Sequence, residues 1–321
     1  MRRFLRLVFV WSLLLFLIAA GLDYIISSGL KRTDIRKYAV WNDIYTGKAS
    51  ADVIVLGSSR AWCGYNTYLL DSLLNCNSYN LGIDGHGIDY QIIRYKTYLK
   101  YNKKPDLLIL NVDFGSTLCI SSDKRYEREQ FFPYVLDGTL ISEIAKDKKI
   151  TFFDRYLPLY RYIGYHQEII NGIKAFWGDK NYEDGGMHKG YRGNNYAWSP
   201  GLLSTQGITD VAKDIDDTKV TLLRDFLCRL KDEGTDVIMV KAPFFRPLFD
   251  KISGVSVSDS IFLDLAQTYN ILLFDYYYSD CGKDSANFYN PSHLNAVGSE
   301  IFTKQLCGDI DSCITDMFLR R

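Results

Sequence analysis

Four short polar segments of the sequence hold the residue types that acyl transfer requires. The segment Gly57-Ser58-Ser59-Arg60 offers a serine nucleophile, and Asn290-Pro291-Ser292-His293 offers a histidine base. Between them along the chain lie the glycine-rich segment 82–87 and the segment Asn111-Val112-Asp113. Acyl transfer needs a nucleophile, a general base and hydrogen-bond donors for the developing oxyanion. The four segments together supply these three parts.

The segments must be brought together by the elements that precede them. Apolar runs typical of buried strands occupy residues 52–56, 77–81, 106–112, 236–240 and 271–274. Amphipathic runs typical of helices occupy residues 88–101, 219–233, 259–269 and 295–306. Strands that alternate with helices predict a doubly wound α/β domain with a mainly parallel sheet. Because ligands bind at the carboxyl ends of the strands in such sheets, the polar segments are expected to converge there.

The order and spacing of these segments resemble the SGNH/GDSL hydrolase superfamily. In that superfamily a Gly-x-Ser block follows the first strand, and an Asp-x-x-His block precedes the last helix. The resemblance covers residues 51–115 and 219–306 and implies a flavodoxin-like sheet. The stretches VIVLGSSRA and PSHLNAVG are most similar to membrane-anchored, extracytoplasmic members. Those members act in the O-acetylation of cell-surface polysaccharides or the D-alanylation of teichoic acids.

The resemblance assigns a role to several residues. Ser59 aligns with the nucleophile, and Ser58 serves the turn. Gly82 aligns with the glycine whose amide completes the oxyanion hole with that of Ser59. His293 aligns with the general base. Structural roles remain open beside these assignments: Ser59 as a helix cap, Gly82 as a turn glycine and His293 as a helix-start residue.

Two positions depart from the pattern of the superfamily. The asparagine of its third block aligns with Asp113, although Asn111 is the match if the strand ends sooner. An ionised carboxylate opposes a developing oxyanion, so Asp113 cannot inherit the donor role. The aspartate of the Asp-x-x-His block is Asn290 here. In a serine protease the corresponding change costs roughly 10⁴ in turnover. The carbonyl of Asn290 can still accept the Nδ1–H of histidine, and Asp284 is a second candidate partner.

The N-terminus predicts a membrane anchor. Residues 7–22 carry no charge, Asp23 interrupts, and residues 24–30 are again mostly apolar. A membrane span needs about 20 apolar residues. The small residues Ala19-Ala20-Gly21 leave a cleavable signal peptide as the alternative. Basic residues flank both sides of the run, yet either reading places the main domain outside the cytoplasm.

The expected organisation has four parts. Residues 1–30 form the anchor or signal peptide, residues 31–50 a juxtamembrane linker, residues 51–308 the α/β domain and residues 309–321 a tail. An insertion over residues 116–218 interrupts the α/β domain and is expected to fold over the carboxyl edge of the sheet. It is rich in aromatic residues, which form either a satellite hydrophobic cluster or a surface whose rings stack on sugars.

Composition excludes several other function classes. Lys and Arg total 38 and Asp and Glu total 38, so the chain lacks the basic excess of a nucleic-acid-binding protein. No phosphate-binding loop or dinucleotide fingerprint is present, and no pair of histidines has the spacing of metal ligands. The seven cysteines include no CxxC pair. We therefore expect neither a cofactor nor a metal.

The sequence supports two hypotheses of different class. The first is a membrane-anchored serine esterase or O-acyltransferase that acts on acyl esters, such as acetyl esters, of a cell-surface glycan. The second is a catalytically degenerate accessory protein that binds a polysaccharide or a membrane acyltransferase. The two hypotheses differ in whether a site with asparagine at position 290, where the superfamily has aspartate, is still catalytically active.

Overall fold

The computed structural model describes residues 1–119, 127–138, 140, 144, 150–179, 187–196, 198–199 and 210–318. The chain divides into two compact units. The first unit contains residues 1–45 and 123–186, and the second contains residues 46–122 and 187–321. The predicted domain boundaries remain a prediction, but the predicted insertion is shared between the two units.

The second unit is built on a parallel sheet of five strands. The strands are β1 (Val53–Leu56), β2 (Ser78–Asn80), β3 (Leu107–Asn111), β4 (Asp236–Lys241) and β5 (Leu272–Asp275). Their order in the sheet is β2-β1-β3-β4-β5, and every neighbouring pair is parallel. This is the flavodoxin-like order, whose switch point lies between β1 and β3. The predicted doubly wound α/β fold with a mainly parallel sheet is confirmed.

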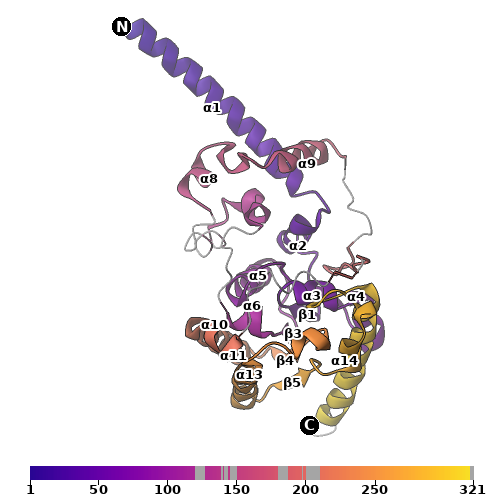
Figure 1. Cartoon of the computed structure of the whole chain (residues 1–321). Helices are drawn as coiled ribbons and strands as arrows, with labels where there is room; N and C mark the ends of the chain where they lie inside the picture. The colour runs from indigo at the N-terminus through magenta and orange to yellow at the C-terminus, as the bar shows by residue number, and fades with distance from the viewer. Residues whose placement is uncertain are drawn as a thin grey trace. The chain divides into compact units, whose positions relative to one another are not determined.

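Helices cover both faces of this sheet (Figure 1). One group of helices packs together and comprises α5 (Ile88–Tyr101), α6 (Phe114–Leu118), α11 (Asp217–Asp232) and α13 (Val255–Tyr269). The other group comprises α3 (Ser59–Gly64), α4 (Thr67–Leu74) and α14 (Ala296–Phe318). The described part of the unit is completed by the short helices α10 (Val211–Asp214) and α12 (Arg246–Phe249), the 3-10 helices η5 (Asp280–Lys283) and η6 (Ser285–Asn287), and the hairpin of β6 (Phe288–Asn290) and β7 (His293–Leu294).

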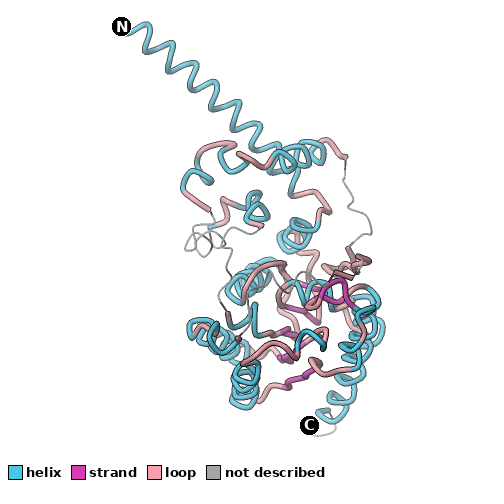
Figure 2. The backbone as a smooth tube through the Cα atoms, in the orientation of Figure 1, coloured by secondary structure: helices cyan, strands magenta, loops and turns pink. Residues whose placement is uncertain are grey.

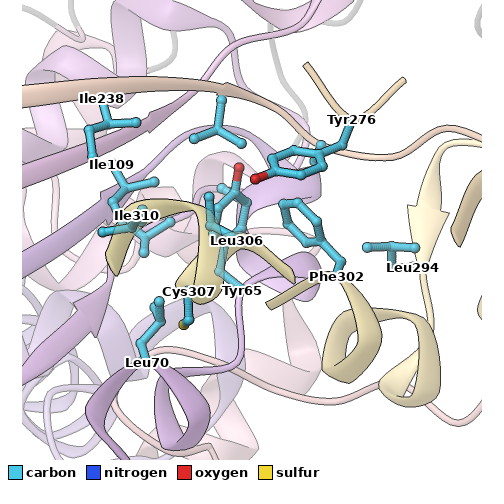
Figure 3. Packing of buried hydrophobic residues seen from close by; sticks show 14 of the residues in the cluster. Tyr65, Leu70, Ile109, Ile238, Tyr276, Leu294, Phe302, Leu306, Cys307 and Ile310 are labelled. Atoms are coloured by element: carbon cyan, nitrogen blue, oxygen red, sulfur yellow. The ribbon is translucent and has the colours of Figure 1, made fainter. Parts of the chain in front are cut away.

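A buried cluster fixes α3, α4 and α14 to the sheet (Figure 3). Alternate strand residues such as Val55, Ile109 and Val240 point into it, and Phe302 and Leu306 enter from α14. The intervening strand residues are buried as well, which explains why these runs are apolar without alternation. Since α3 begins with Ser59, this packing also holds the candidate nucleophile in place.

The first unit is helical over its described residues, and Figure 2 draws strands only in the second unit. Its elements are α1 (Arg2–Leu30), α2 (Arg36–Tyr45), η1 (Arg128–Tyr134), α8 (Phe152–Tyr156), η3 (Tyr160–Tyr162) and α9 (His166–Phe176). Aromatic residues dominate its interior: Trp41 lies edge-on to Phe131, and Phe132 lies edge-on to Tyr162. Part of the aromatic excess of the sequence is therefore the core of this unit.

The segment predicted as a linker, residues 31–50, is structured instead. Residues 36–45 form α2, whose Tyr38, Trp41 and Ile44 are fully buried. These three residues recur at intervals of three, which brings them to one side of a helix. The charged residues at the start of this helix made the segment resemble a polar linker. In the structure Arg36 and Lys37 form ion pairs with Glu127 and Glu129 at 2.9 and 2.7 Å.

Helix α1 meets the requirements for a membrane span. It has 29 residues with a mean hydropathy of 2.3 over its most apolar window, and this window is not buried by any other part of the described chain. Such length and composition suit a membrane anchor and equally an N-terminal signal sequence. The far end of the helix differs, because Ile26, Ser27, Gly29 and Leu30 are buried within the first unit.

Candidate active site

The tight turn after β1 presents Ser59 at the start of α3. A Cβ atom at Gly57 would lie 2.7 Å from the Cβ of Ala61 and 2.8 Å from that of Asn111, so only glycine fits there. Ser58 is the N-cap residue, and its Oγ accepts a hydrogen bond from the Arg60 amide and donates one to Asp113. Ser58 thus serves the turn, as predicted, and leaves Ser59 as the available hydroxyl. Helix α3 has only six residues and contributes little dipole.

A two-residue connection places Asn290 and His293 side by side. Strand β6 ends at Asn290 and β7 begins at His293, and the two residues pair across the antiparallel hairpin. Pro291 and Ser292 form the connection. The asparagine that replaces the expected aspartate is thereby held against the imidazole ring.

Ser59 and His293, which are 234 positions apart in the sequence, are hydrogen-bonded in the structure. Ser59 Oγ lies 2.6 Å from His293 Nε2, and His293 Nδ1 lies 2.8 Å from Asn290 Oδ1. This is the geometry of a nucleophile, a base and a group that orients the base. The three catalytic residues predicted from the sequence therefore lie together at one edge of the sheet.

The hydrogen-bond network determines which imidazole nitrogen carries the proton. The amide of Ser292 donates to Asn290 at 3.0 Å, so the accepting side-chain atom must be the oxygen Oδ1. Because this oxygen also faces His293 Nδ1, that nitrogen must be the one that is protonated. Ser292 Oγ lies 2.9 Å from Nδ1 and donates to Asn290 Oδ1 at 3.2 Å, which strengthens the same arrangement. The lone pair of Nε2 then points at Ser59 Oγ, as a general base requires.

The electrostatic surroundings keep His293 neutral. Burial, aided by the positive charge of Arg60, lowers the pKa of His293 from 6.5 to about 3. Among the described residues no carboxylate bonds to its ring: Asp284, the second candidate partner, caps the following turn by accepting from the Ala286 amide. An imidazolium formed during reaction thus has only the dipoles of Asn290 and Ser292 to stabilise it.

The Gly82 amide, which the sequence analysis assigned to the oxyanion hole, is engaged elsewhere. It donates to Asn80 Oδ1 at 2.9 Å, and the following amide of Ile83 donates to the Gly57 carbonyl at 3.0 Å. Gly82 instead permits close packing, since a Cβ atom there would lie 2.4 Å from the Trp62 amide nitrogen. Farther along the same loop, Gly85 is exposed with φ at +64°. Within the described chain its amide has no hydrogen-bond partner, and neither has that of Ser59.

The structure separates the two candidates for the third block. Asp113 caps α6: its carboxylate accepts from the Ser116 amide at 2.7 Å and from the hydroxyls of Ser116 and Ser58. A carboxylate engaged by three donors is a structural cap and offers no donor of its own. Asn111 is fully buried at the end of β3 and accepts from the Tyr65 hydroxyl at 2.9 Å. Its Nδ2 group is buried and lacks a partner among the described residues, so Asn111 is the position that still has a donor to offer.

The sequence patterns did not indicate a role for Arg60, although this residue directly follows Ser59. Only 6% of its surface is exposed, and its guanidinium donates to the carbonyls of Ala242 and Pro243. It stacks over the ring of Phe244 at 4.9 Å and forms no ion pair within the described chain. Its Nε and Nη1 atoms are buried without a hydrogen-bond partner among the described residues. The burial of this cation and its lack of an ion pair among the described residues are visible only in the structure. In the sequence, the one signal was the position of Arg60 directly after Ser59.

Aromatic residues of the second unit continue outward from His293. Tyr289 stacks on the imidazole ring with centroids 5.4 Å apart, and Tyr196 lies edge-on to Tyr289 at 6.0 Å. Tyr196 is 66% exposed. The Ser199 amide donates to the Tyr289 carbonyl, which ties the end of the predicted insertion to this hairpin. Of the aromatic residues in the predicted insertion, Tyr196 is thus an exposed one that lies near His293.

Comparisons with known proteins add little to this geometry. No family model matches the chain, and no curated protein matches it. A structure described as a "putative acylhydrolase" from Bacteroides fragilis is 13% identical, covers 80% of this chain and 86% of its own, and has a TM-score of 0.38. A structure described as a "putative platelet activating factor" from Streptococcus pneumonia is 11% identical, covers 87% and 94%, and has a TM-score of 0.36. TM-scores this low carry no argument, so the sheet order and the site geometry stand alone.

Proposed function

We propose that this chain is a serine-dependent acyl-ester hydrolase or O-acyltransferase of the SGNH/GDSL type. The observation that carries the proposal is the contact of 2.6 Å between Ser59 Oγ and the unprotonated nitrogen of His293. The flavodoxin-like sheet order supports it, because the contact lies where such sheets bind ligands.

The proposed reaction has two halves. Ser59 Oγ attacks the acyl carbonyl carbon while His293 Nε2 takes its proton, and the carbonyl oxygen becomes an oxyanion. When the tetrahedral intermediate collapses, the leaving alkoxide takes that proton from His293, and the acyl group stays on Ser59. Water or an acceptor hydroxyl then gives its proton to His293 and attacks the acyl-serine, and the proton returns to Ser59.

We assign the oxyanion donors to groups that have no other partner. The amides of Ser59 and Gly85 and the side-chain amide of Asn111 meet this condition within the described chain. We propose Gly85, which follows Gly82 in the same loop, as the donor in place of Gly82. Arg60 adds a positive charge, which favours the oxyanion and disfavours the imidazolium in the same step.

The proposed substrate is an acyl ester of a cell-surface glycan. The exposed ring of Tyr196 beside Tyr289 supports a sugar ligand, because aromatic faces stack on sugar rings. An enzyme of this type, anchored by α1 with its second unit outside the cytoplasm, would meet such a glycan or a membrane acyltransferase partner. The length and apolar surface of α1 support the anchor.

One observation favours the second candidate, a non-catalytic accessory protein. Within the described residues His293 has no carboxylate partner, and its low pKa makes it a weak base. In that role the residues around His293 would bind an acylated glycan without turning it over.

Hydrolysis of an aryl acetate by the purified full-length chain in detergent tests the proposal. Ser59→Ala should lower kcat by roughly 10³-fold or more, to the background of the site. Ser260→Ala is the control, because it removes an exposed hydroxyl of α13 and keeps the nucleophile and its turn. It should retain most of the turnover. Equal rates for Ser59→Ala and the parent chain would exclude this mechanism and favour the accessory role.

A further inference from the structure

Residues 151–178 of the first unit expose an unusual amount of apolar surface. Phe152, Ile163 and Trp177 are 69%, 71% and 77% exposed. The rings around α8 touch one another, with Phe152 4.7 Å from Tyr156 and Phe152 5.9 Å from Phe153. The exposed rings around α8 thus form a contiguous aromatic patch, and Ile163 and Trp177 add exposed apolar side chains in the same segment.

The exposed residues of α9 lie on one face of that helix. Ile170, Ile173 and Trp177 follow the helical spacing of three and four residues, and all three are exposed. The opposite face, with Glu168 and Gly172, is buried. An amphipathic helix normally turns its apolar face inward, and this one also presents an apolar stripe outward.

The acidic residues of the same segment are hidden. Asp154 is 1% exposed and pairs with Arg128 at 2.7 Å, and Glu168 is 6% exposed and pairs with Lys37 at 3.0 Å. These are the only two carboxylates in residues 151–178. The surface of this segment therefore combines aromatic and aliphatic side chains with the exposed base Lys174, and the exposed carboxylate of Asp179 follows directly after it.

This segment is bound to the end of helix α1. A Cβ atom at Gly29 would lie 1.7 Å from the Gly172 carbonyl oxygen, so α1 and α9 cross in backbone contact. Asp23 accepts from the Leu159 amide at 2.8 Å and pairs with Arg161. The charge that interrupts the apolar run of α1 is thus neutralised by the segment next to it.

The position of Asp23 along α1 places the segment relative to a bilayer. Residues 4–22, which include Arg6 near their start, rise about 28 Å at 1.5 Å per residue, close to the roughly 30 Å of a hydrocarbon core. Asp23 then falls at the boundary between hydrocarbon and headgroups. Residues 151–178 contact α1 from Asp23 to Gly29, a further rise of about 9 Å, so they span the interface, where aromatic side chains are favoured in membrane proteins.

We propose that residues 151–178 form a membrane-interface collar whose exposed aromatic and aliphatic side chains insert into the same bilayer that α1 spans. The occupant of the patch is lipid, because the patch continues the lipid-facing surface of α1 and because the burial of the segment's two carboxylates suits anionic headgroups. The collar rests on the membrane anchor in the proposed function and is independent of the chemistry at Ser59.

Lipid quenching of Trp177 tests the collar. The full-length chain is reconstituted into nanodiscs of phosphatidylcholine and phosphatidylglycerol, with or without bromine on the acyl chains. Subtracting the emission of Trp177→Phe from that of the parent chain isolates Trp177. Trp11→Phe does the same for a residue in the predicted span. We expect brominated lipid to reduce the isolated emission of both residues, and aqueous iodide to leave both nearly unchanged.

Every other pattern overturns the collar. Quenching of Trp177 by iodide alone would place it in water, and quenching by neither agent would mean that protein, such as a second copy, covers the patch. If Trp11 also escapes the brominated lipid, the span on which the collar rests is wrong. Loss of esterase activity in Ser59→Ala does not alter these signals, so the collar and the proposed chemistry fail separately.

Discussion

At the scale of single residues, His293 works beside a cation and an amide in place of a carboxylate. Burial and Arg60 both oppose its protonation, and Asn290 supplies only a dipole. The base is therefore unprotonated throughout the ordinary pH range, but it holds a proton poorly once it has taken one. Proton removal from Ser59 is therefore the demanding step, whereas the imidazolium readily gives its proton to a leaving alkoxide.

The pH dependence of turnover should show the lowered pKa of His293. Activity requires neutral His293, so it falls as pH drops through the pKa, which lies near 3 instead of 6.5. We expect kcat/KM for an aryl acetate to stay level on acidification from about pH 7 to about pH 5. Arg60→Met removes the repulsion and should move the acidic inflection upward. An inflection near the ordinary histidine value in the parent chain would contradict this electrostatic account.

Asn290→Asp tests how far the asparagine weakens the site. A carboxylate at this position would stabilise the imidazolium and raise the pKa of His293, because opposite charges favour the protonated form. We expect kcat to increase at least about tenfold near neutral pH, a fraction of the loss caused by the reverse change in a serine protease. Asn290→Ala, which removes the acceptor, should lower kcat. An unchanged rate in both variants would show that residue 290 does not orient the base.

At the scale of elements, the loop after β2 positions α3 by close packing. A Cβ atom at Gly82 would lie 2.4 Å from the backbone nitrogen of Trp62, and backbone cannot give way as a side chain can. Gly82→Ala should therefore lower the free energy of unfolding by about 1–3 kcal/mol and displace Ser59.

Gly308→Ala is the matched control for that substitution. Gly308 lies within α14 with no atom within 4 Å of its added Cβ. Alanine there should raise the stability by roughly 0.5–1 kcal/mol, because it favours the helix. Denaturant unfolding of the two variants, followed by circular dichroism, measures both effects. Equal stabilities for the two would show that the contact between Gly82 and α3 contributes nothing.

Local patterns were sufficient to predict the sheet and its catalytic edge. Continuous apolar runs located all five strands, and the residues that follow β1 and precede α14 indicated Ser59 and His293. Such patterns could not predict which backbone amides are free to bind an oxyanion. The Gly82 amide donates to Asn80 Oδ1, a contact that depends on the direction of the Asn80 side chain. The first unit also escaped prediction, because residues 1–45 and 123–186 are joined by contacts distant in sequence.

At the scale of the whole molecule, the chain combines a predicted membrane anchor with a second unit that carries the proposed catalytic residues. The aromatic excess of the sequence serves both: rings such as Trp41 and Phe131 fill the first unit, and Tyr289 and Tyr196 stand beside the base in the second. The zero net charge of the chain does not show this division. Some charges of the first unit form internal ion pairs, such as Lys37 with Glu129 and Arg128 with Asp154.

Cys228 tests the side of the membrane on which the second unit lies. It is the exposed cysteine of α11, whereas Cys63, Cys119, Cys281 and Cys307 are buried. An impermeant maleimide should label the chain in intact cells, or in spheroplasts where an outer membrane is present, and Cys228→Ser should remove most of that label. Labelling that appears only after the cells are permeabilised would place the unit in the cytoplasm.

Covalent capture of Ser59 is the most direct test of the central claim. The full-length chain is treated with a fluorophosphonate, and the modified peptide is identified by mass spectrometry, with His293→Gln as the control that removes the base. The account predicts one adduct on Ser59 in the parent chain and a strongly reduced yield in His293→Gln. A folded chain that acquires no adduct on Ser59, or acquires it equally without the histidine, would contradict an active Ser59–His293 pair.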